Sequence, residues 1–345
     1  MIRLEDTLSK LKTSVDNGVL LYTDREQLNR YITDVVGANL EDVLRTLHVQ
    51  IEKPHILCEE EVGNPNVAIH YTTIRVLASM LQEATNTPDQ SSLRLYDTNN
   101  FNDPDEGNFF NRNLGPKSPA TDALLDIEYS PHAYIASFII PRSKTEDRNS
   151  DTNRDMSNNL VFWRTYGDER QGCSLTLVVP RNKLRKVLYG RDAVRRTSGL
   201  LLPVLDSIHD CLKPILDLPS TDYIRDHLQR TICGHIDKVR YLYKSDAYDY
   251  ERECRIVIPE SEANKDLIRF QYDHSNSSGV SVKHYYEVEA LRVRNIFLTG
   301  SVIRFGPRVS RPDNLRYYLQ SLLDRIDRSY GPMFKTSKLP YQVAD

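Results

Sequence analysis

Cysteine is scarce in this chain, which has five among 345 residues. No two of them have C-x-x-C spacing, and they are scattered at Cys58, Cys173, Cys211, Cys233 and Cys254. An odd number of widely separated cysteines favours neither a disulfide framework nor a cysteine-rich zinc site. We therefore expect these residues to be buried, reduced thiols.

Long apolar runs and an excess of charge of one sign are also lacking. No segment is apolar over a length that could span a bilayer, and residues 1–6 lack the apolar core of a signal peptide. The 45 basic and 48 acidic residues give a net charge of -3. Such a balance provides no overall attraction to nucleic acid or anionic membranes, so any nucleic-acid contact would have to be local. We expect a cytoplasmic protein without a membrane partner.

Several catalytic and ligand-binding motifs are missing. The sequence has no G-x-S-x-G nucleophile elbow and no pair of histidines at metal-binding spacing. No lysine follows Gly300 or Gly306, so a phosphate-binding loop is not supported. The residues Asp103, Asp105 and Glu106 lack the regular acidic spacing of a calcium loop. We assign no metal.

The first part of the chain is predicted to be helical. Residues 23–26 have capping-box spacing, and apolar residues recur at helical intervals in residues 28–36 and again in residues 39–51. We predict two regions, an N-terminal helical region at residues 1–62 and a mixed α/β domain at residues 63–345. The apolar faces of the helices favour packing on the main body, and binding of a partner is the alternative.

The second region alternates strands and helices. A strand at residues 67–71 runs into a helix capped by Thr72 or Thr73. Two strands at residues 268–272 and 280–288 flank a turn rich in Ser, Asn and Gly, which predicts a hairpin. The other predicted elements are strands at 93–96, 134–140, 173–179, 251–259 and 292–298, and helical segments at 160–166, 200–242 and 314–326.

The segment from Tyr250 to Pro259 is the most informative part of the chain. Two glutamates, two residues apart, enter a β-branched strand that ends at a proline. Because side chains alternate between the faces of a strand, the even-numbered positions 254–258 form an apolar stripe. The other face carries Glu251, Glu253 and Arg255. This polar face is either the wall of a cleft or the wet face of a solvated edge strand with an ion pair.

Short motifs extend over most of the chain after the helical region. They are His70–Thr72, Phe101–Gly107, Ser137–Phe138, Trp163–Tyr166, Gly172–Cys173, Tyr250–Arg255 and Ser337–Tyr341. Through these motifs the chain resembles a bacterial family known as domain of unknown function number 2971. The pair His70 and Tyr71 and the motif Glu251-x-Glu253 also resemble the ADP-ribosyltransferase superfamily. In that superfamily a His or Arg strand, an aromatic or Ser strand and a Glu strand surround a split NAD cleft.

The resemblance implies a fold, a cofactor and a partner. The implied fold is α+β, with an ADP-ribosyltransferase-like split antiparallel β-sheet core, surrounding helices and an N-terminal helical extension. The implied cofactor is NAD, and the implied partner is a macromolecular acceptor, either protein or nucleic acid. Families of this kind include toxins and antiphage effectors.

The resemblance also implies roles for individual residues. Glu253 would hold the ribose hydroxyl and the developing charge, while Glu251 would orient or activate the acceptor. His70 would hydrogen-bond the ribose on the adenosine side. Tyr71 would stack near the nicotinamide, although His70 and Tyr71 point to opposite faces of a strand. The other candidates for cofactor binding are Ser137, Trp163 and Tyr166.

These residue types fit the chemistry. Cleavage of the nicotinamide glycosidic bond develops positive charge on the ribose. A carboxylate fixed beside that charge stabilises the transition state more than the ground state. A single glutamate at the right place therefore has a large effect on the rate.

Two other functions stay open. One is a metal-dependent nuclease, in which Glu251, Glu253 and Arg255 act together with Asp103 or Asp105. The near-neutral net charge weighs against it. The other is a non-catalytic interaction module, in which the two glutamates belong to a surface ion network and the N-terminal helices bind a partner.

Overall fold

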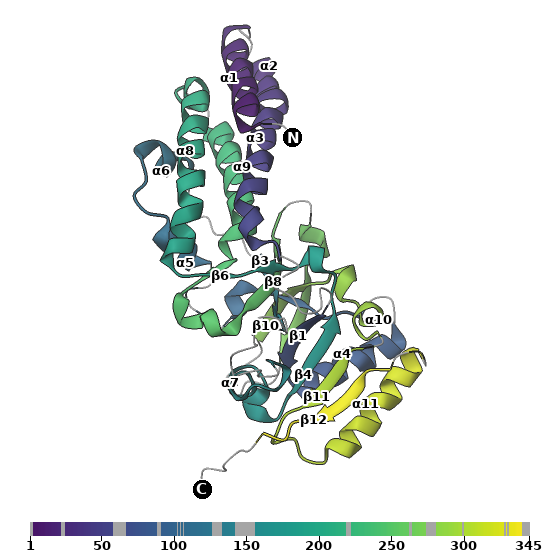
Figure 1. Cartoon of the computed structure of the whole chain (residues 1–345). Coiled ribbons are helices and arrows are strands. Elements are labelled where there is room, and N and C mark those ends of the chain that lie inside the picture. Colours follow the sequence, from purple (N-terminus) through teal and green to yellow (C-terminus); the bar gives the residue numbers. More distant parts are fainter. Residues whose placement is uncertain are drawn as a thin grey trace.

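The chain consists of a helical bundle and a mixed α/β body. A computed structural model describes residues 3–21, 25–57, 67–87, 91–101, 103, 105, 107–125, 133–141, 156–218, 222–261, 264–273, 281–298, 300–327, 329 and 331–339. The bundle stands on one end of the body, which makes the molecule elongated, and the C-terminal strands lie at the opposite end (Figure 1). None of the described helices combines the length and the hydropathy that a membrane crossing requires.

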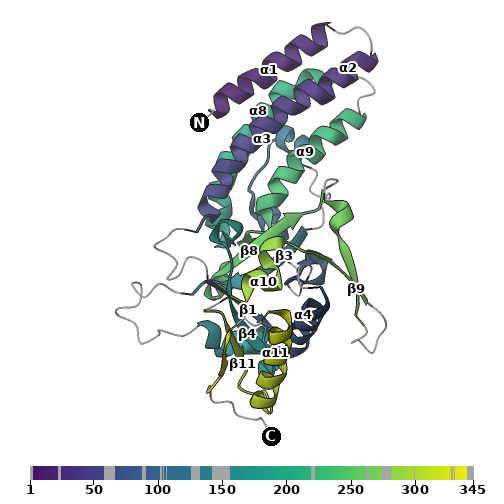
Figure 2. The same ribbon diagram turned by 90° about the vertical axis from the view of Figure 1, so that its right-hand side faces the viewer.

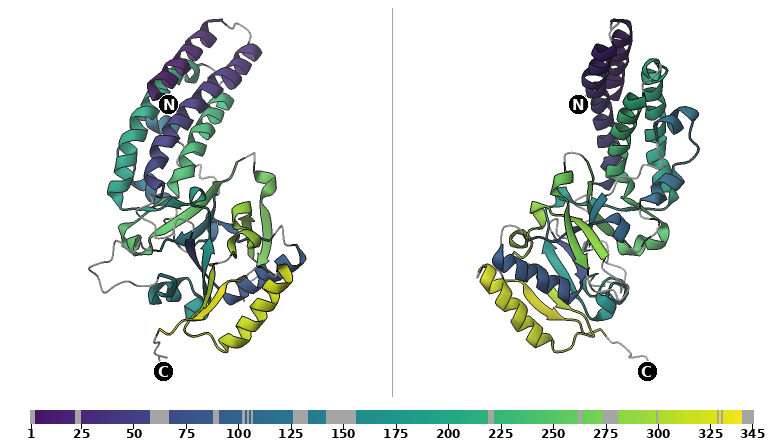
Figure 3. Two further views of the ribbon diagram at one scale, coloured as in Figure 1. Left: turned by 45° about the vertical axis from the view of Figure 1, so that its right-hand side comes forward. Right: turned by 180° about the vertical axis from the view of Figure 1, so that it is seen from behind.

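The bundle joins the N-terminal helices to helices from the middle of the chain. Its long members are α1 (Leu4–Leu21), α2 (Arg25–Tyr31), α3 (Gly37–Glu52), α8 (Arg191–Leu216) and α9 (Asp222–Arg240). They run side by side in both views of Figure 3. Their apolar residues form one core, which includes Leu40, Leu44, Leu205 and Ile232. Two short helices, α5 (Asn108–Asn113) and α6 (Pro119–Leu124), pack against α8.

The N-terminal helices therefore use their apolar faces inside the molecule. They share a core with α8 and α9, which come from the region predicted to be the α/β domain. The predicted boundary between residues 62 and 63 lies outside the described residues. The partner predicted for these helices stays a prediction.

The body is built on one large sheet. Its strands are β1 (Val67–Thr72), β2 (Leu95–Asp97), β3 (Ala133–Ile139), β4 (Cys173–Val178), β5 (Arg185–Lys186), β8 (Glu253–Pro259), β9 (Arg269–Asp273), β10 (Ser281–Tyr286), β11 (Val302–Phe305) and β12 (Met333–Thr336). Their order is β12-β11-β4-β1-β3-β2-β10-β9, and β8 pairs with both β3 and β5. All neighbours are antiparallel except β11 and β12, which are parallel. The mixed α/β class with a mostly antiparallel sheet is thus confirmed.

Two helices cover one face of this sheet. They are α4 (Ile74–Asn86) and α11 (Pro312–Ile326), which lie next to each other in Figure 2. Leu81 of α4 and Leu319 of α11 belong to the same core as Leu175 and Leu177 of β4. The other face carries a smaller core, in which Trp163 of α7 (Leu160–Thr165) lies with residues of β1.

The sheet opens between β1 and β3. Strand β1 pairs with β4 along its length, and β3 pairs with β8 along its length. Between β1 and β3, however, the described register contains one pair, Ile69 with Ile139. Beyond that pair the two strands diverge, and the imidazole of His70 bonds to the backbone of β3 at Ser137. The opening lies between β1, which contains His70 and Tyr71, and the β3–β8 pair, which contains Glu253.

One predicted strand is a helix. Residues 292–298 were expected to be extended, but α10 (Val293–Ile296) is a short helix. The buried residues in this segment are Val293, Ile296 and Phe297, which recur at helical spacing rather than at every second position. The predicted hairpin is confirmed as β9 and β10, whereas its turn at residues 274–280 lies outside the described residues.

Gly172 precedes β4 where a side chain would meet the end of β1. A Cβ atom at this position would lie 2.3 Å from the carbonyl oxygen of Thr72. We expect Gly172→Ala to destabilise the fold by about 1–3 kcal/mol, because both backbones would have to move. Urea unfolding measures this change. Gly199→Ala is the control, since that helical position has no atom within 4 Å of the added Cβ. The prediction fails if the two variants are equally stable.

Candidate active site

A cavity of about 430 Å³ lies at the opening between β1 and β3. This volume is in the range of small-molecule sites. Five segments of the chain provide its wall, namely β1, the residues after β2, β3, α7 with Tyr166, and residues 244–255. The residues that line it are Ile69, His70, Tyr71, Phe101, Asp103, Ser137, Phe138, Ile139, Phe162, Thr165, Tyr166, Lys244, Tyr248, Glu251, Glu253 and Arg255.

Strand β8 forms one side of the cavity, and its two faces have different roles. Cys254 and Ile256 are part of the main core, which confirms the predicted apolar stripe. Glu253 and Arg255 lie on the cavity side, paired in register with Ile139 and Ser137 of β3. The alternative of a solvated edge strand is wrong here, because β8 has a partner on each side and both charged residues are buried.

The prediction that Glu251 belongs to the same strand is wrong. Glu251 ends a 3-10 helix at Asp246–Glu251, and β8 begins at Glu253. Between them Arg252 has a φ of 46°, in the left-handed region, which interrupts an extended conformation. Glu251 still lines the same cavity as Glu253, because the turn at Arg252 changes the direction of the chain but keeps both side chains beside the cavity.

Glu253 is a buried carboxylate held by two cations. Its Oε1 atom lies 2.7 Å from Nε of Arg255, and its Oε2 atom accepts hydrogen bonds from Nη2 of Arg255 and Nζ of Lys244, each at 3.0 Å. Burial by itself raises the pKa of Glu253, but Arg255, Lys244 and a hydrogen bond from Ser137 outweigh it and lower the pKa to about 2. Glu253 is therefore ionised at neutral pH.

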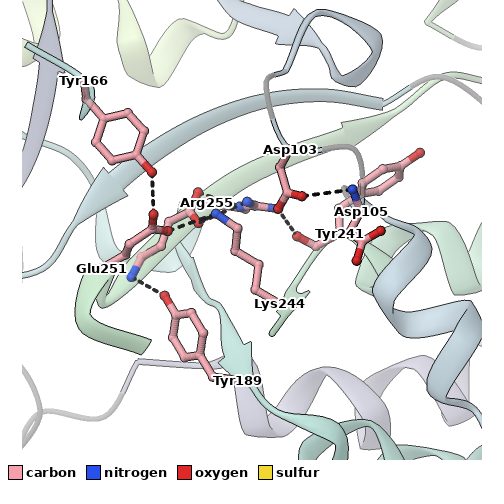
Figure 4. Close-up of polar contacts among 9 residues, drawn as sticks. Asp103, Asp105, Tyr166, Tyr189, Tyr241, Lys244, Glu251 and Arg255 are labelled. Atoms are coloured by element: carbon pink, nitrogen blue, oxygen red, sulfur yellow. Dashed lines mark hydrogen bonds and ion pairs between the residues drawn. The ribbon is translucent and has the colours of Figure 1, made fainter. Parts of the chain in front are cut away.

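Lys244 connects the two glutamates. Its Nζ atom donates to Oε2 of Glu251 at 2.9 Å and to Oε2 of Glu253 at 3.0 Å. Burial lowers the pKa of Lys244, yet the attraction of Glu253 and Glu251 is larger and leaves the pKa above its ordinary value. Figure 4 shows this side chain reaching toward Glu251, close to the guanidinium group of Arg255.

Two tyrosine hydroxyls contact the same cluster. Tyr166 donates a hydrogen bond to Oε1 of Glu251, and this bond together with burial raises the pKa of Tyr166. The hydroxyl of Tyr189 accepts a hydrogen bond from the backbone N–H of Glu253 at 2.8 Å. In Figure 4 the two tyrosines come from different elements toward one cluster. Tyr166 is 43% exposed, so it stands at the solvent side of the cavity.

His70 reaches the cavity through the opening of the sheet. By register it faces the same side as Leu175, a main-core residue. Its Nδ1 atom lies 2.9 Å from the carbonyl oxygen of Ser137. In the neutral ring this bond assigns the hydrogen to Nδ1 and leaves Nε2 as an acceptor. Burial lowers the pKa of His70, which favours this neutral form.

Tyr71 and Trp163 differ in their position relative to the cavity. Tyr71 lines the cavity, and its hydroxyl donates to the carbonyl oxygen of Met156 at 2.7 Å. Trp163 is fully buried and packs edge-on against Tyr71, with 4.9 Å between ring centroids. Trp163 is not among the cavity-lining residues, and it supports Tyr71 from behind.

Acidic residues in the cavity do not form a metal-ligand cluster. Asp103 lines the cavity and accepts a hydrogen bond from the backbone N–H of Asp105 at 2.9 Å. Among the described residues no group of three His, Cys, Asp or Glu side chains is placed to hold a metal ion. The positions near Glu251 and Glu253 where a cation would lie contain Lys244 and Arg255.

Three further residues of the cavity or its cluster, Lys244, Tyr189 and Tyr248, were not predicted from the sequence. Lys244 lies in β7 (Tyr243–Lys244), which pairs with β6 (Leu188–Tyr189) to form a separate two-stranded sheet. Strands of two residues have no readable periodicity. The density of tyrosines in residues 241–250 was the available signal, because exposed and half-buried aromatic residues often surround ligand sites.

The chain was compared with protein-family models, curated proteins and solved structures, and no match was found in any of the three.

Proposed function

We propose that this protein is an NAD-consuming enzyme of the ADP-ribosyltransferase type. One observation supports the proposal most. His70 and Glu253, which are distant in the sequence, line one cavity where two parts of an antiparallel sheet diverge. Tyr71, Ser137, Tyr166 and Glu251 line the same cavity.

The proposed reaction transfers ADP-ribose from NAD to an acceptor. The bond between C1′ of the ribose and the nicotinamide nitrogen breaks, and nicotinamide leaves with the electron pair. A nucleophilic atom of the acceptor forms the new bond to C1′ and releases its proton. Glu253, which is ionised and fixed by two cations, stabilises the positive charge that develops on the ribose.

Other cavity residues have roles in binding. Nε2 of His70 accepts a hydrogen bond from a hydroxyl of the adenosine-side ribose, and Tyr71 stacks near the nicotinamide. Glu251 orients the acceptor. We include in the proposal an ADP-ribosyltransferase-like sheet core and membership of family 2971.

The alternatives have less support. A metal-dependent nuclease needs carboxylate oxygens that coordinate a metal ion, but Lys244 and Arg255 occupy positions beside Glu251 and Glu253 where such an ion would lie. A module with a surface ion network does not fit either, because the side chains of Glu251 and Glu253 are 4% and 7% exposed. A toxin or antiphage role rests on the resemblance of the sequence alone.

Incubation with labelled NAD tests the proposed function. The purified protein and its Glu253→Gln variant are mixed with NAD labelled in the adenylate part, with and without whole-cell extract. We expect nicotinamide to be released by the wild-type protein and the label to move to protein, nucleic acid or water. The destination of the label identifies the acceptor class. Absence of any Glu253-dependent release would overturn the proposal.

His70→Ala is expected to weaken the binding of NAD more than its conversion. A neutral hydrogen bond contributes about 1 kcal/mol, so KM should rise about fivefold while kcat changes little. Steady-state kinetics measures both constants. His284→Ala is the control, because His284 is 40% exposed and is not among the cavity-lining residues. An unchanged KM in His70→Ala would contradict the assigned role.

A further inference from the structure

Lys244 occupies a position that the proposed reaction does not by itself require. Its side chain is 9% exposed, and its Nζ atom bonds to both Glu251 and Glu253. The two Oε2 atoms are therefore no farther apart than the sum of the two hydrogen-bond lengths. Two ionised carboxylates this close repel each other, and a cation between them offsets this repulsion.

Other charged and titratable groups lie around Lys244. Arg255 bonds to Glu253, and Tyr166 bonds to Glu251. The ring of Tyr248 lies 5.1 Å from Nζ and contributes a cation–π contact. Other polar groups near this cluster are His70, Asp103, Ser137, Thr165, Tyr189 and Tyr250.

The backbone of Lys244 is anchored independently of its ammonium group. Its carbonyl oxygen accepts a hydrogen bond from the N–H of Gly190 at 2.9 Å. The preceding residue, Tyr243, is buried, and its hydroxyl bonds to Nε2 of His55 at 3.0 Å and to the hydroxyl of Thr197 at 2.6 Å. Loss of the ammonium group alone should thus leave the chain in place.

We propose that Lys244 is a positioning residue that keeps Glu251 and Glu253 ionised together and aligned on one cavity. Its catalytic meaning rests on the proposed function, whereas its effect on the two carboxylates does not. The two carboxylates repel each other with or without Lys244, and what a neutral residue at this position loses is the attraction of the ammonium group that offsets this repulsion. Without Lys244, Glu253 keeps its bonds from Arg255.

The test is a carboxyl titration by NMR with ¹³C-labelled glutamate. Glu251→Gln and Glu253→Gln assign the two signals. In Lys244→Met we expect the carboxyl titration of the Glu251–Glu253 pair as a whole to move to higher pH than in the wild type, because the pair has lost a neighbouring positive charge. Lys244→Arg should restore the wild-type titration, since it keeps the positive charge. Lys183→Met is the matched control, because Lys183 is exposed and is not a cavity residue.

A second readout is the pH dependence of NAD turnover. We expect the low-pH limb of the profile to move upward in Lys244→Met by the same interval as the titration, and to return in Lys244→Arg. A merely structural lysine would lower the rate at every pH without moving this limb. Titration signals and a pH profile that are unchanged in Lys244→Met would overturn the inference.

Two further outcomes are distinguishable. If the wild-type protein consumes no NAD, the proposed function fails, while the NMR titration still decides the effect of Lys244 on the carboxylates. If Lys244→Met does not fold, the double variant Lys244→Met with Glu251→Gln tests the inference instead, because it lacks the repulsion between the carboxylates of residues 251 and 253. Recovery of Tm in the double variant supports the inference, and no recovery overturns it.

Discussion

Glu253→Gln is expected to reduce NAD turnover about a thousandfold. At about 4 Å and an effective dielectric constant near 20, a carboxylate attracts a unit positive charge by roughly 4 kcal/mol, which corresponds to about three decades of rate. Glutamine has nearly the same shape but no charge, so the loss falls on the transition state. Release of nicotinamide under saturating NAD measures it.

The control for this variant is Glu287→Gln. Glu287 is half-buried and, like Glu253, lies near an arginine, here Arg94, but it is not among the cavity-lining residues. Its replacement should leave turnover within about twofold of wild type. Equal rates in Glu253→Gln and wild type would exclude Glu253 from the chemistry.

The same variant should change the pH dependence of stability. The pKa of Glu253 is about 2 in the folded protein, below its ordinary value of 4.5. The ionised group therefore contributes stability that is fully present above about pH 4.5 and is lost as the pH falls toward 2. A shift of this size corresponds to about 3 kcal/mol. Urea unfolding should show this difference from wild type at pH 7 and little difference near pH 2.

Arg255→Met is expected to destabilise the protein by about 3–5 kcal/mol at pH 7. The side chain of Arg255 is 1% exposed and makes two hydrogen bonds to Glu253 and one to the carbonyl oxygen of Tyr241. Its loss leaves Glu253 buried with one cation fewer, which is the costly way to break a buried ion pair. Equilibrium unfolding in urea measures the change.

A double variant separates charge from packing in this case. Arg255→Met combined with Glu253→Gln removes both charges, so it should recover much of the stability lost in Arg255→Met. The comparison residue is Arg94, which pairs with Glu83 at 2.8 Å at a less buried position. Arg94→Met should cost about 1 kcal/mol or less. A double variant no more stable than Arg255→Met would show that the ion pair is not the cause.

Much of the fold could be predicted because its main elements have local patterns. The strands β1, β3 and β4 are dense in apolar residues, and the closing helix α11 has apolar residues at helical spacing. The strand expected at residues 292–298 was wrong because β-branched residues occur there at spacings that also suit a helix. Tertiary burial, and not propensity, decides such short segments.

The candidate site could be predicted only in part. The sequence indicated His70, Glu251 and Glu253, and all three line one cavity. It could not indicate that Arg252 takes a left-handed conformation between the glutamates, since one residue in a turn leaves no periodic signal. The bridging role of Lys244 depends on contacts made after α9 returns the chain to the sheet. No short segment of the sequence indicates such contacts.

The segments that connect the helical bundle to the sheet contain residues that bond to Glu253. The chain leaves for α8 directly after Tyr189 and returns from α9 at Tyr243 and Lys244. Tyr189, before α8, bonds to the backbone N–H of Glu253, and Lys244, after α9, bonds to the carboxylate of Glu253. Tilting the α8–α9 pair against the sheet would pull on both attachments at once. Both attachments of Glu253 therefore lie where the chain passes between the sheet and the bundle.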